Sequence, residues 1–172
     1  VYVGEGIENL IHFLALNALG AIPAIVNGNM PAKTAALWME KVGATGLFSD
    51  PAHAQAISPY VKGNRAFRFF VNDNSAAEVY APKLPGKYPF RHAATDPVLI
   101  GHSSGTTGIP KAVQFQHQQF FFGVRYRLGL PFAKGSESIL SALPHSHSAG
   151  LAYVMLAVLN GCNFIMQNEY CK

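Results

Sequence analysis

Residues 97–115 read PVLIGHSSGTTGIPKAVQF, and this stretch sets the fold of the chain. The β-prone runs Pro97–His102 and Ala112–Phe115 enclose Ser103–Lys111, a segment dominated by glycine and hydroxyl side chains. Short apolar runs bounded by glycine, serine and proline are typical of buried strands that meet at a polar loop. The stretch therefore predicts two strands joined by a loop that is rich in hydrogen-bond donors.

This loop combines the donors that a polyphosphate requires. Gly105 and Gly108 carry no Cβ, so backbone amides there can approach an anion closely, while Pro110 and Lys111 add a stiff exit and an ammonium group. Hydroxyl donors come from Ser103, Ser104, Thr106 and Thr107. An exposed flexible linker is the alternative, since clusters of glycine, serine and threonine often form linkers. The flanking strands and the Pro-Lys ending favour phosphate binding.

The loop differs from the P-loop of common nucleotide triphosphatases. That motif needs Gly-Lys-[Ser/Thr] at the start of a helix, where the backbone amides surround the phosphates. Here Lys111 follows Pro110, precedes Ala112 and leads into a strand. The sequence therefore argues against a kinase or a GTPase.

The rest of the chain alternates between helical and strand-like patterns. The predicted helices span 8–19, 31–42, 117–130 and 151–159, and the predicted strands span 1–3, 22–26, 46–49, 67–71, 138–143 and 163–166. This alternation predicts an α/β fold of layered mixed sheets with flanking helices. Because the first helix is apolar nearly all round, we expect it to be buried on most sides.

The chain divides at a stretch that shows neither the helical nor the strand-like pattern. Residues 72–96 are rich in proline and polar residues and are expected to form a connector. It separates residues 1–71, part of an α/β subdomain, from residues 97–172, which carry the phosphate-loop hairpin and a following α/β part.

Composition narrows the class of protein further. Of 172 residues, 49% are hydrophobic and only 13% are charged, and the net charge is +4. This composition excludes a disordered chain and predicts that some apolar surface normally faces other protein. Lysine and arginine form no cluster, which argues against nucleic-acid binding.

The expected location is the cytoplasm. Glu5 and Glu8 interrupt the place where the apolar core of a secretory signal would begin, and the apolar stretch 149–159 is too short to span a membrane. Cys162 and Cys171 allow at most one disulfide, so reduced thiols are the default. We therefore expect a soluble, cytoplasmic protein without a membrane span.

Several motifs together resemble one family. The segment Ser103–Val113 is similar to the signature loop of the adenylate-forming superfamily, which includes acyl-CoA synthetases, adenylation domains of non-ribosomal peptide synthetases and firefly-type luciferases. The lead-in at 96–100, the upstream segment 20–23 and the P-x-x-H-x-x-G pattern at 144–150 are similar as well. The resemblance covers essentially the whole chain. Ala112 departs from the family, which most often has glycine there.

The resemblance implies a two-step, ATP-dependent ligase. A carboxylate attacks the α-phosphate of Mg·ATP to give an acyl-adenylate and pyrophosphate, and a thiol then displaces AMP to form a thioester. The thiol belongs to coenzyme A or to the phosphopantetheine of a carrier protein. The implied phosphate-binding residues are Ser103, Ser104, Gly105, Thr106, Thr107, Gly108 and Lys111, of which Thr106, Thr107 and Lys111 would take part in catalysis.

The resemblance also assigns His147 to the wall of the acyl pocket. A hydrogen-bonded loop histidine is the alternative for this residue. In the family, the magnesium ligand, the adenine and ribose contacts and a catalytic lysine follow the position of Lys172. The chain 1–172 therefore resembles an internal fragment of the large N-terminal domain, and its partners include the remainder of its own N- and C-terminal domains. We expect the fragment alone to bind ATP weakly and to turn over nothing.

Some alternatives stay open at this point. A non-catalytic binding or assembly module that keeps the fold is the second function class, although the intact loop argues against it. The carboxylic acid and the choice between coenzyme A and a carrier protein are also open. His145 and His147 have no standard zinc spacing with the cysteines, so no metal site is expected within the chain.

The remaining aromatic and histidine residues have structural interpretations. His102 and His117 flank the two β runs and are expected to form hydrogen bonds rather than to catalyse. Phe67, Phe69 and Phe70 and the run 120–122 are expected to pack in the core or between subdomains.

Overall fold

The computed structural model describes residues 1–61, 68–71, 90–103, 108–127 and 137–166. Its helices are α1 (Ile7–Ala18), α2 (Ala32–Lys41), α3 (Pro51–Val61), α4 (His117–Arg127) and α5 (Ser148–Asn160). Its strands are β1 (Gly46–Ser49), β2 (Arg68–Val71), β3 (Pro97–Ser103), β4 (Lys111–Gln116), β5 (Ser138–Ser141) and β6 (Asn163–Met166). The predicted α/β class is confirmed.

Two extended segments join β1–β2 and β3–β4 into one sheet. β1 pairs in parallel with β2, and β3 pairs antiparallel with β4. Residues 1–3 and 23–26 lie between these pairs and are linked to them by parallel bridges, which are Tyr2 with Ser49, Tyr2 with Val26, and Ala24 with Ile100. The order across the sheet is therefore β2, β1, residues 1–3, residues 23–26, β3 and β4. The predicted strands 1–3 and 22–26 are thus isolated bridges rather than full strands.

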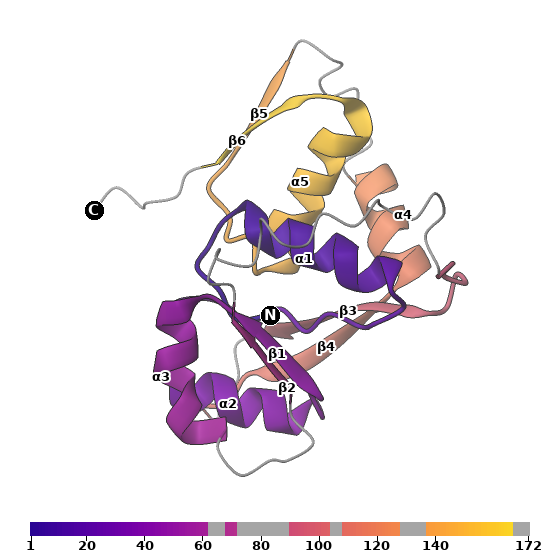
Figure 1. Cartoon of the computed structure of the whole chain (residues 1–172). Coiled ribbons are helices and arrows are strands. Elements are labelled where there is room, and N and C mark those ends of the chain that lie inside the picture. Colours follow the sequence, from indigo (N-terminus) through magenta and orange to yellow (C-terminus); the bar gives the residue numbers. More distant parts are fainter. Residues whose placement is uncertain (62–67, 72–89, 104–107, 128–136, 167–172) are drawn as a thin grey trace, which may run out of the picture.

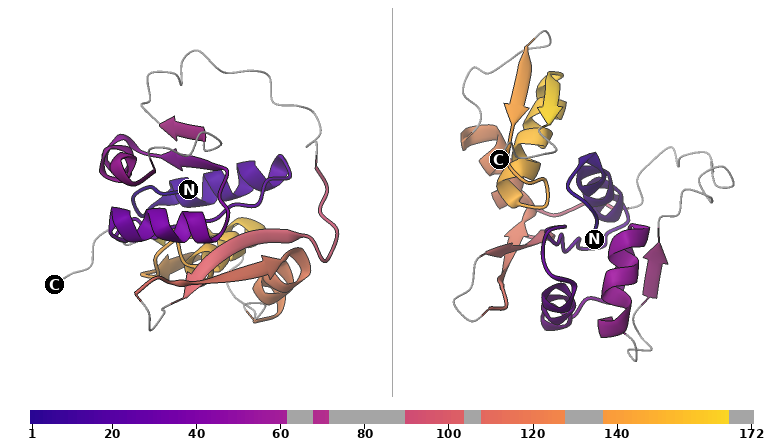
Figure 2. Two further views of the ribbon diagram at one scale, coloured as in Figure 1. Left: turned by 90° about the horizontal axis from the view of Figure 1, so that it is seen from below. Right: turned by 90° about the vertical axis from the view of Figure 1, so that its left-hand side faces the viewer.

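Helices cover both faces of this main sheet (Figure 1). α2 packs against α3 on one face, while α1 and α4 both contact α5 on the other. β5 and β6 pair in parallel and lie against α5, at the end of the molecule farthest from α2 and α3 (Figure 2). None of the described helices is both long and apolar enough to cross a membrane.

The core consists of two clusters, one on each face of the sheet. The first joins α1, β3, α4 and α5 through residues such as Phe13, Val98 and Leu151. The second lies under α2 and includes Trp38 and Leu47. The first cluster combines buried residues that precede and follow the stretch 72–96, and the partly buried Ile100 and Ile109 pack against the second from beyond it. Residues 72–89 of this stretch lie outside the described part of the chain. The division at this stretch therefore stays a prediction from composition.

α1 is less buried than its sequence predicts. Its buried residues are Asn9, Leu10, Phe13 and Asn17, which form one stripe along the helix. The opposite face carries Ile7, Ile11 and Leu14, which are 41–54% exposed. The prediction that this helix is buried on most sides is wrong for the described residues, because neighbouring elements meet only one of its faces.

α3 is a helix that the sequence patterns did not predict. Pro51 at its start and Pro59 inside it resemble a loop composition, and only Ala54 and Ile57 are buried. The carboxylate of the preceding Asp50 accepts the backbone N–H of His53 at 2.9 Å, which satisfies one free amide of the first turn. A proline in the first turn loses no helical hydrogen bond. The Asp-Pro pair was therefore a start signal that could have identified this helix.

The other predicted elements agree with the structure to within a few residues. β1 and β6 have the predicted bounds, and α4 covers the described part of the predicted helix 117–130. α5 begins at Ser148, three residues earlier than predicted, so the preceding loop ends at His147. Gly20 and Gly43 follow α1 and α2 with φ angles of 77° and 67°, as expected for residues that end helices.

The phenylalanines divide between core and surface. Phe120 is 5% exposed and belongs to the first cluster, and Phe121 packs against it. Phe69, Phe70 and Phe122 are 37%, 55% and 59% exposed, so the expectation of core packing is wrong for these three within the described residues, and packing between subdomains stays a prediction. Phe67 lies outside the described residues.

Candidate functional site

Five parallel segments of the main sheet have their carboxyl ends on the same side of the sheet, which we call the carboxyl edge. They are β2, β1, residues 1–3, residues 23–26 and β3. In open α/β sheets, ligands bind at this edge, next to the point where connections leave toward opposite faces. Residues 1–3 lead to α1 on one face, whereas residues 23–26 lead to α2 on the other (Figure 1). The predicted phosphate loop leaves from the same edge, at the end of β3.

The described ends of the phosphate loop are open to solvent. Ser103 at the end of β3 pairs with Lys111 at the start of β4, so the ladder holds both ends side by side. Ser103, Gly108 and Lys111 are exposed. Gly108 has a φ of 82°, and an added Cβ would meet nothing within 4 Å, so conformation rather than crowding favours glycine there. The other predicted phosphate-binding residues, Ser104, Gly105, Thr106 and Thr107, lie outside the described residues.

His102 connects the first end of the loop to a neighbouring segment. The backbone N–H of Asn27, directly after residues 23–26, donates to His102 Nε2 at 3.3 Å. The His102 and Trp38 rings form a T-shaped contact with a centroid distance of 5.9 Å and an interplanar angle of 84°. The hydrogen-bonding role predicted for this histidine is confirmed. His117, at the other end of the hairpin, stacks on His92 at a centroid distance of 5.7 Å.

Lys41 contacts the second end of the loop, and no sequence pattern singled it out. Its Nζ, in the last turn of α2, donates to the carbonyl of Pro110 at 3.4 Å. The neighbouring Ile109 packs against the second core cluster. Lys41 therefore brings an ammonium group to the end of the loop that also carries Lys111. Its distance of 69 residues along the chain explains why local patterns could not find it.

The motif at 144–150 lies at the same edge and is tied to the loop that precedes α1. The carboxylate of Glu5 accepts the backbone N–H of Ser146 at 3.1 Å and also accepts the Ser146 hydroxyl. Gly150 is required by crowding, because a Cβ there would collide with the carbonyl of Pro144. The glycine of the motif thus has a packing explanation.

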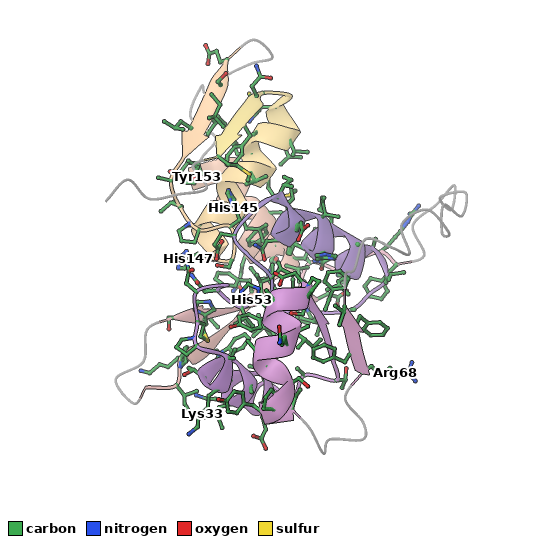
Figure 3. The ribbon with its side chains drawn as sticks, turned by 60° about the vertical axis from the view of Figure 1, so that its left-hand side comes forward. Lys33, His53, Arg68, His145, His147 and Tyr153 are labelled. Carbon is green, nitrogen blue, oxygen red and sulfur yellow. The ribbon has the colours of Figure 1, made fainter. Side chains whose placement is uncertain are left out.

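His147 caps α5. Its Nδ1 accepts the backbone N–H of Ala149 at 3.2 Å, while the side chain remains exposed. This hydrogen bond is the structural role that the sequence left open for His147, and its place in an acyl pocket stays a prediction. Figure 3 shows His147 between His145 and His53 along one side of the molecule.

His145 differs from His147 because it belongs to the interior. It is 3% exposed, and its ring meets the Phe164 ring edge-on at 5.7 Å. Burial lowers the pKa of His145, and the Glu5 carboxylate opposes this shift. Nε2 of His145 is buried and has no hydrogen-bond partner among the described residues. Within the described ranges, no group of three or more His, Cys, Asp or Glu side chains is arranged to hold a metal ion.

Asp50 and His53 link neighbouring loops by hydrogen bonds at the part of the carboxyl edge next to β1. The Asp50 carboxylate accepts the N–H of Gly4 at 3.0 Å and meets His53 Nδ1 at 2.7 Å, and His53 Nε2 meets the Gly28 carbonyl at 2.9 Å. Burial alone would raise the pKa of Asp50, but the hydrogen bonds from His53 and Gly4 lower it below its ordinary value. The pair thus fastens three loops that follow three parallel segments.

An apolar hollow of about 660 Å³ lies at the opposite edge of the sheet. It is lined by residues that precede or begin the parallel segments, among them residues 20–24 and residues 43–46. Few polar groups face it, so it lacks the donors that phosphates need. The candidate site is therefore the carboxyl edge and not the hollow.

Comparison with known proteins identifies the family. The family model described as AMP-binding enzyme matches residues 1–171. The chain belongs to the AMP-binding enzyme family. The resemblance to the adenylate-forming superfamily is thereby confirmed.

Relatives within the AMP-binding family differ in their named reactions. The chain is 38% identical over 152 residues to a 3-aminoavenalumate diazotase of Streptomyces sp, covering 88% of this chain and 26% of the relative. It is 27% identical over 166 residues to the fatty acid–[acyl-carrier-protein] ligase MmaC of Mycobacterium marinum, covering 91% of this chain and 31% of the relative. The chain thus spans about a quarter to a third of these relatives.

Solved structures of AMP-binding enzymes share the fold. The inhibitor-bound N-terminal domain of FACL13 from Mycobacterium tuberculosis superposes with a TM-score of 0.82 at 19% identity. The match covers 99% of this chain and 44% of that domain. It supports the predicted architecture, part of an N-terminal domain of the adenylate-forming fold.

Proposed function

We propose that the full-length protein activates a carboxylic acid with ATP and transfers the acyl group to a thiol. One observation carries this proposal: within an AMP-binding family chain, the two ends of the glycine- and hydroxyl-rich loop are exposed at the carboxyl edge of the sheet. The amide and hydroxyl groups that the loop sequence supplies, together with the exposed ammonium group of Lys111, suit the triphosphate of ATP.

The first step joins the acid to AMP. A carboxylate oxygen attacks the α-phosphorus, the bond between the α-phosphorus and the bridging oxygen breaks, and pyrophosphate leaves with both of its phosphates. Lys111 and the hydroxyl and amide donors of residues 103–108 would hold the β- and γ-phosphates and then the leaving pyrophosphate. These groups would act by positioning the reactants and by stabilising negative charge on phosphate oxygens.

The second step transfers the acyl group. A thiolate attacks the acyl carbon of the adenylate, and AMP leaves as a thioester forms. The named reaction of the 27% identical relative, a fatty acid–[acyl-carrier-protein] ligase, supports a carboxylic acid and a carrier-bound thiol. Coenzyme A is the other thiol that could accept the acyl group. Magnesium would accompany ATP, with its protein ligand elsewhere in the full-length protein.

An exchange assay tests the first step. The full-length protein is incubated with ATP, magnesium, radioactive pyrophosphate and single members of a panel of carboxylic acids. Acid-dependent appearance of label in ATP supports the proposal, because only a reversible adenylation returns pyrophosphate to ATP. A protein that binds ATP but shows no exchange with any of these acids, nor with the nitrite of the second candidate below, supports the alternative of a non-catalytic binding or assembly module.

A second candidate follows from the 38% identical relative, which is named a diazotase. Diazotisation of an aryl amine needs an activated form of nitrous acid, and nitrite is, like a carboxylate, an anion with two oxygens on one central atom. Its attack on the α-phosphorus would release pyrophosphate and give a nitrosyl adenylate. An amine would then take the nitrosyl group and release AMP, and loss of water would leave the diazonium ion. Exchange that depends on nitrite, with no exchange for any carboxylic acid, would favour this candidate.

The 172 residues by themselves are proposed to bind ATP weakly and to catalyse neither step. The chain covers 26% and 31% of the two relatives, so most of their length has no counterpart in it. Calorimetry of the isolated chain with ATP tests this point. An affinity in the micromolar range, or adenylate formation by the chain alone, contradicts it.

A further inference from the structure

We propose that His102 is a positioning residue that fixes the first end of the phosphate loop and releases it when its imidazole gains a proton. The inference rests on the proposed function, because it concerns how the ATP-binding loop is held. No sequence motif assigns this role to His102.

His102 occupies the junction between sheet and loop. Its backbone pairs with Ala112 of β4 in the hairpin, and Ser103, the first predicted phosphate-binding residue, follows it directly. Its side chain extends toward the other neighbour of β3, where Nε2 accepts the N–H of Asn27 at 3.3 Å. The hydrogen bond therefore joins the carboxyl ends of β3 and of residues 23–26, immediately beside the loop. A shift of His102 would move Ser103 with it.

This hydrogen bond exists in only one protonation state of the ring. A backbone amide can only donate, so Nε2 of His102 must supply a lone pair. The neutral imidazole with its proton on Nδ1 meets this requirement. The imidazolium ion carries a proton on each nitrogen and would place an N–H against the N–H of Asn27. Protonation therefore removes the bond and makes the contact repulsive.

The surroundings of His102 favour the neutral ring. The Trp38 ring of α2 meets it edge-on at 5.9 Å, and the side chain is half-buried. In the part of the chain that the structure describes, the charged or titratable groups that face it are Glu5, from the loop before α1, and His147, from the loop before α5. Burial lowers the pKa of His102, the charge of His147 lowers it further, and the Glu5 carboxylate partly opposes both.

The consequence is a loop whose first end is fixed near neutral pH and loosened in acid. Because the pKa in the folded protein is lowered, the ring is neutral at and above the ordinary histidine range and gains its proton only below it. ATP affinity should therefore be full near neutrality and fall once the pH drops below the ordinary histidine range.

The test compares two substitutions of His102 in the full-length protein. His102→Gln places an amide oxygen near the position of Nε2 and does not titrate, whereas His102→Phe removes the acceptor and keeps a planar ring. His117→Gln is the matched control, because it removes a histidine from the opposite end of the same hairpin, away from the loop. The dissociation constant of Mg·ATP is measured by calorimetry between about pH 5.5 and pH 8. Circular dichroism verifies that each variant is folded.

We expect His102→Phe to weaken ATP binding about three- to tenfold near neutral pH, and His102→Gln to recover most of that loss. In acid, the ATP affinity of the wild-type protein and of His117→Gln should approach that of His102→Phe. His102→Gln should still bind ATP more tightly than His102→Phe does. Since ATP itself titrates, the ratio between variants at each pH is the readout. The inference is overturned if His102→Phe binds as the wild type does at neutral pH, or if His102→Gln keeps the wild-type pH profile.

Failure of this inference is distinct from failure of the proposed function. A wild-type protein that does not bind ATP at any pH contradicts the proposed function and the inference together. A wild-type protein that binds ATP with an affinity indifferent to His102 contradicts only the positioning role. If His102→Phe does not fold, the acid profile of His102→Gln against the wild type alone decides the question.

Discussion

The carboxyl edge of the main sheet has two neighbouring parts that differ in how their polar groups are used. In the closed part, defined as Gly4, Gly28, Asp50 and His53, a carboxylate and an imidazole fasten three loops. In the open part, defined as Ser103, Gly108 and Lys111, the described residues are exposed.

The difference shows that position at the carboxyl edge does not by itself make a ligand site. Hydrogen-bond donors that already hold neighbouring loops together have no capacity left for a ligand. Donors that the fold leaves exposed keep that capacity. Substitutions in the closed part should therefore change stability, and substitutions in the open part should change nucleotide chemistry.

The largest expected effect belongs to the open part. Lys111→Met should lower kcat/KM for adenylation by about 10²- to 10³-fold, because it removes a cation from the developing charge on the phosphates. Its thermal stability should stay close to that of the wild type, since Lys111 is exposed. Pyrophosphate exchange and thermal unfolding of the full-length protein measure the two effects.

Lys33→Met is the charge-matched control for this experiment. Lys33 lies exposed in the first turn of α2, and its substitution changes the net charge by the same amount. Equal loss of activity in both variants would mean that overall charge, and not the loop position, is responsible.

The closed part should show the opposite behaviour. Asp50→Asn should lower the free energy of unfolding by about 2 kcal/mol, because it removes the charge that accepts hydrogen bonds from Gly4 and His53. The affinity for ATP should be unchanged. Urea denaturation and calorimetry provide the measurements.

Asp96→Asn is the control for Asp50→Asn. Asp96 accepts a hydrogen bond from the nearby Ala93 N–H within one turn, so its substitution should lower the free energy of unfolding less. A loss of ATP affinity in Asp50→Asn without a loss of stability would erase the distinction between the two parts.

The stability difference at Asp50 should depend on pH. The hydrogen bonds hold the pKa of folded Asp50 below its ordinary value of 3.8, so its carboxylate contributes stability above that value. This contribution is lost as the pH falls through the lowered folded-state pKa. The wild type and Asp50→Asn should therefore differ fully near pH 7 and converge as the pH falls well below 3.8. Denaturation curves at several pH values check this, and a constant difference down to the lowest pH would rule out the carboxylate as the cause.

The smallest effect is expected at Lys41, and measuring it decides whether this residue belongs to the open part. Its ammonium group lies 3.4 Å from the Pro110 carbonyl and is exposed, so Lys41→Met should weaken ATP binding only about two- to threefold. Higher salt should shrink the difference, because exposed charges are screened. The same Lys33→Met variant is the control. A Lys41→Met variant that binds ATP as the wild type does at low salt would exclude Lys41 from the site.

Most elements of the fold were predictable because their signals are local. The alternation of apolar and polar residues located α2, β1 and β6, and the loop between β3 and β4 was visible from its residue types alone. α3 was missed because its prolines resemble a loop, although Asp50-Pro51 is a start signal for a helix. The exposure of one face of α1 could not be predicted, since a pattern that is apolar all round does not say which face other elements cover.

The sequence alone determined the hydrogen-bond donors of the proposed phosphate loop: a run of amides, hydroxyls and a lysine between two strands, in a chain that alternates between helices and strands. The tertiary structure decided which distant residues support that run. Asn27 reaches His102 across 75 residues, and Lys41 reaches Pro110 across 69. At the 144–150 motif of the same edge, Glu5 reaches Ser146 across 141 residues. The physical reason is that hydrogen-bonding propensity and periodicity act over a few neighbouring residues. Contacts at the carboxyl edge arise only when parallel pairing and helix packing bring the ends of separate segments together.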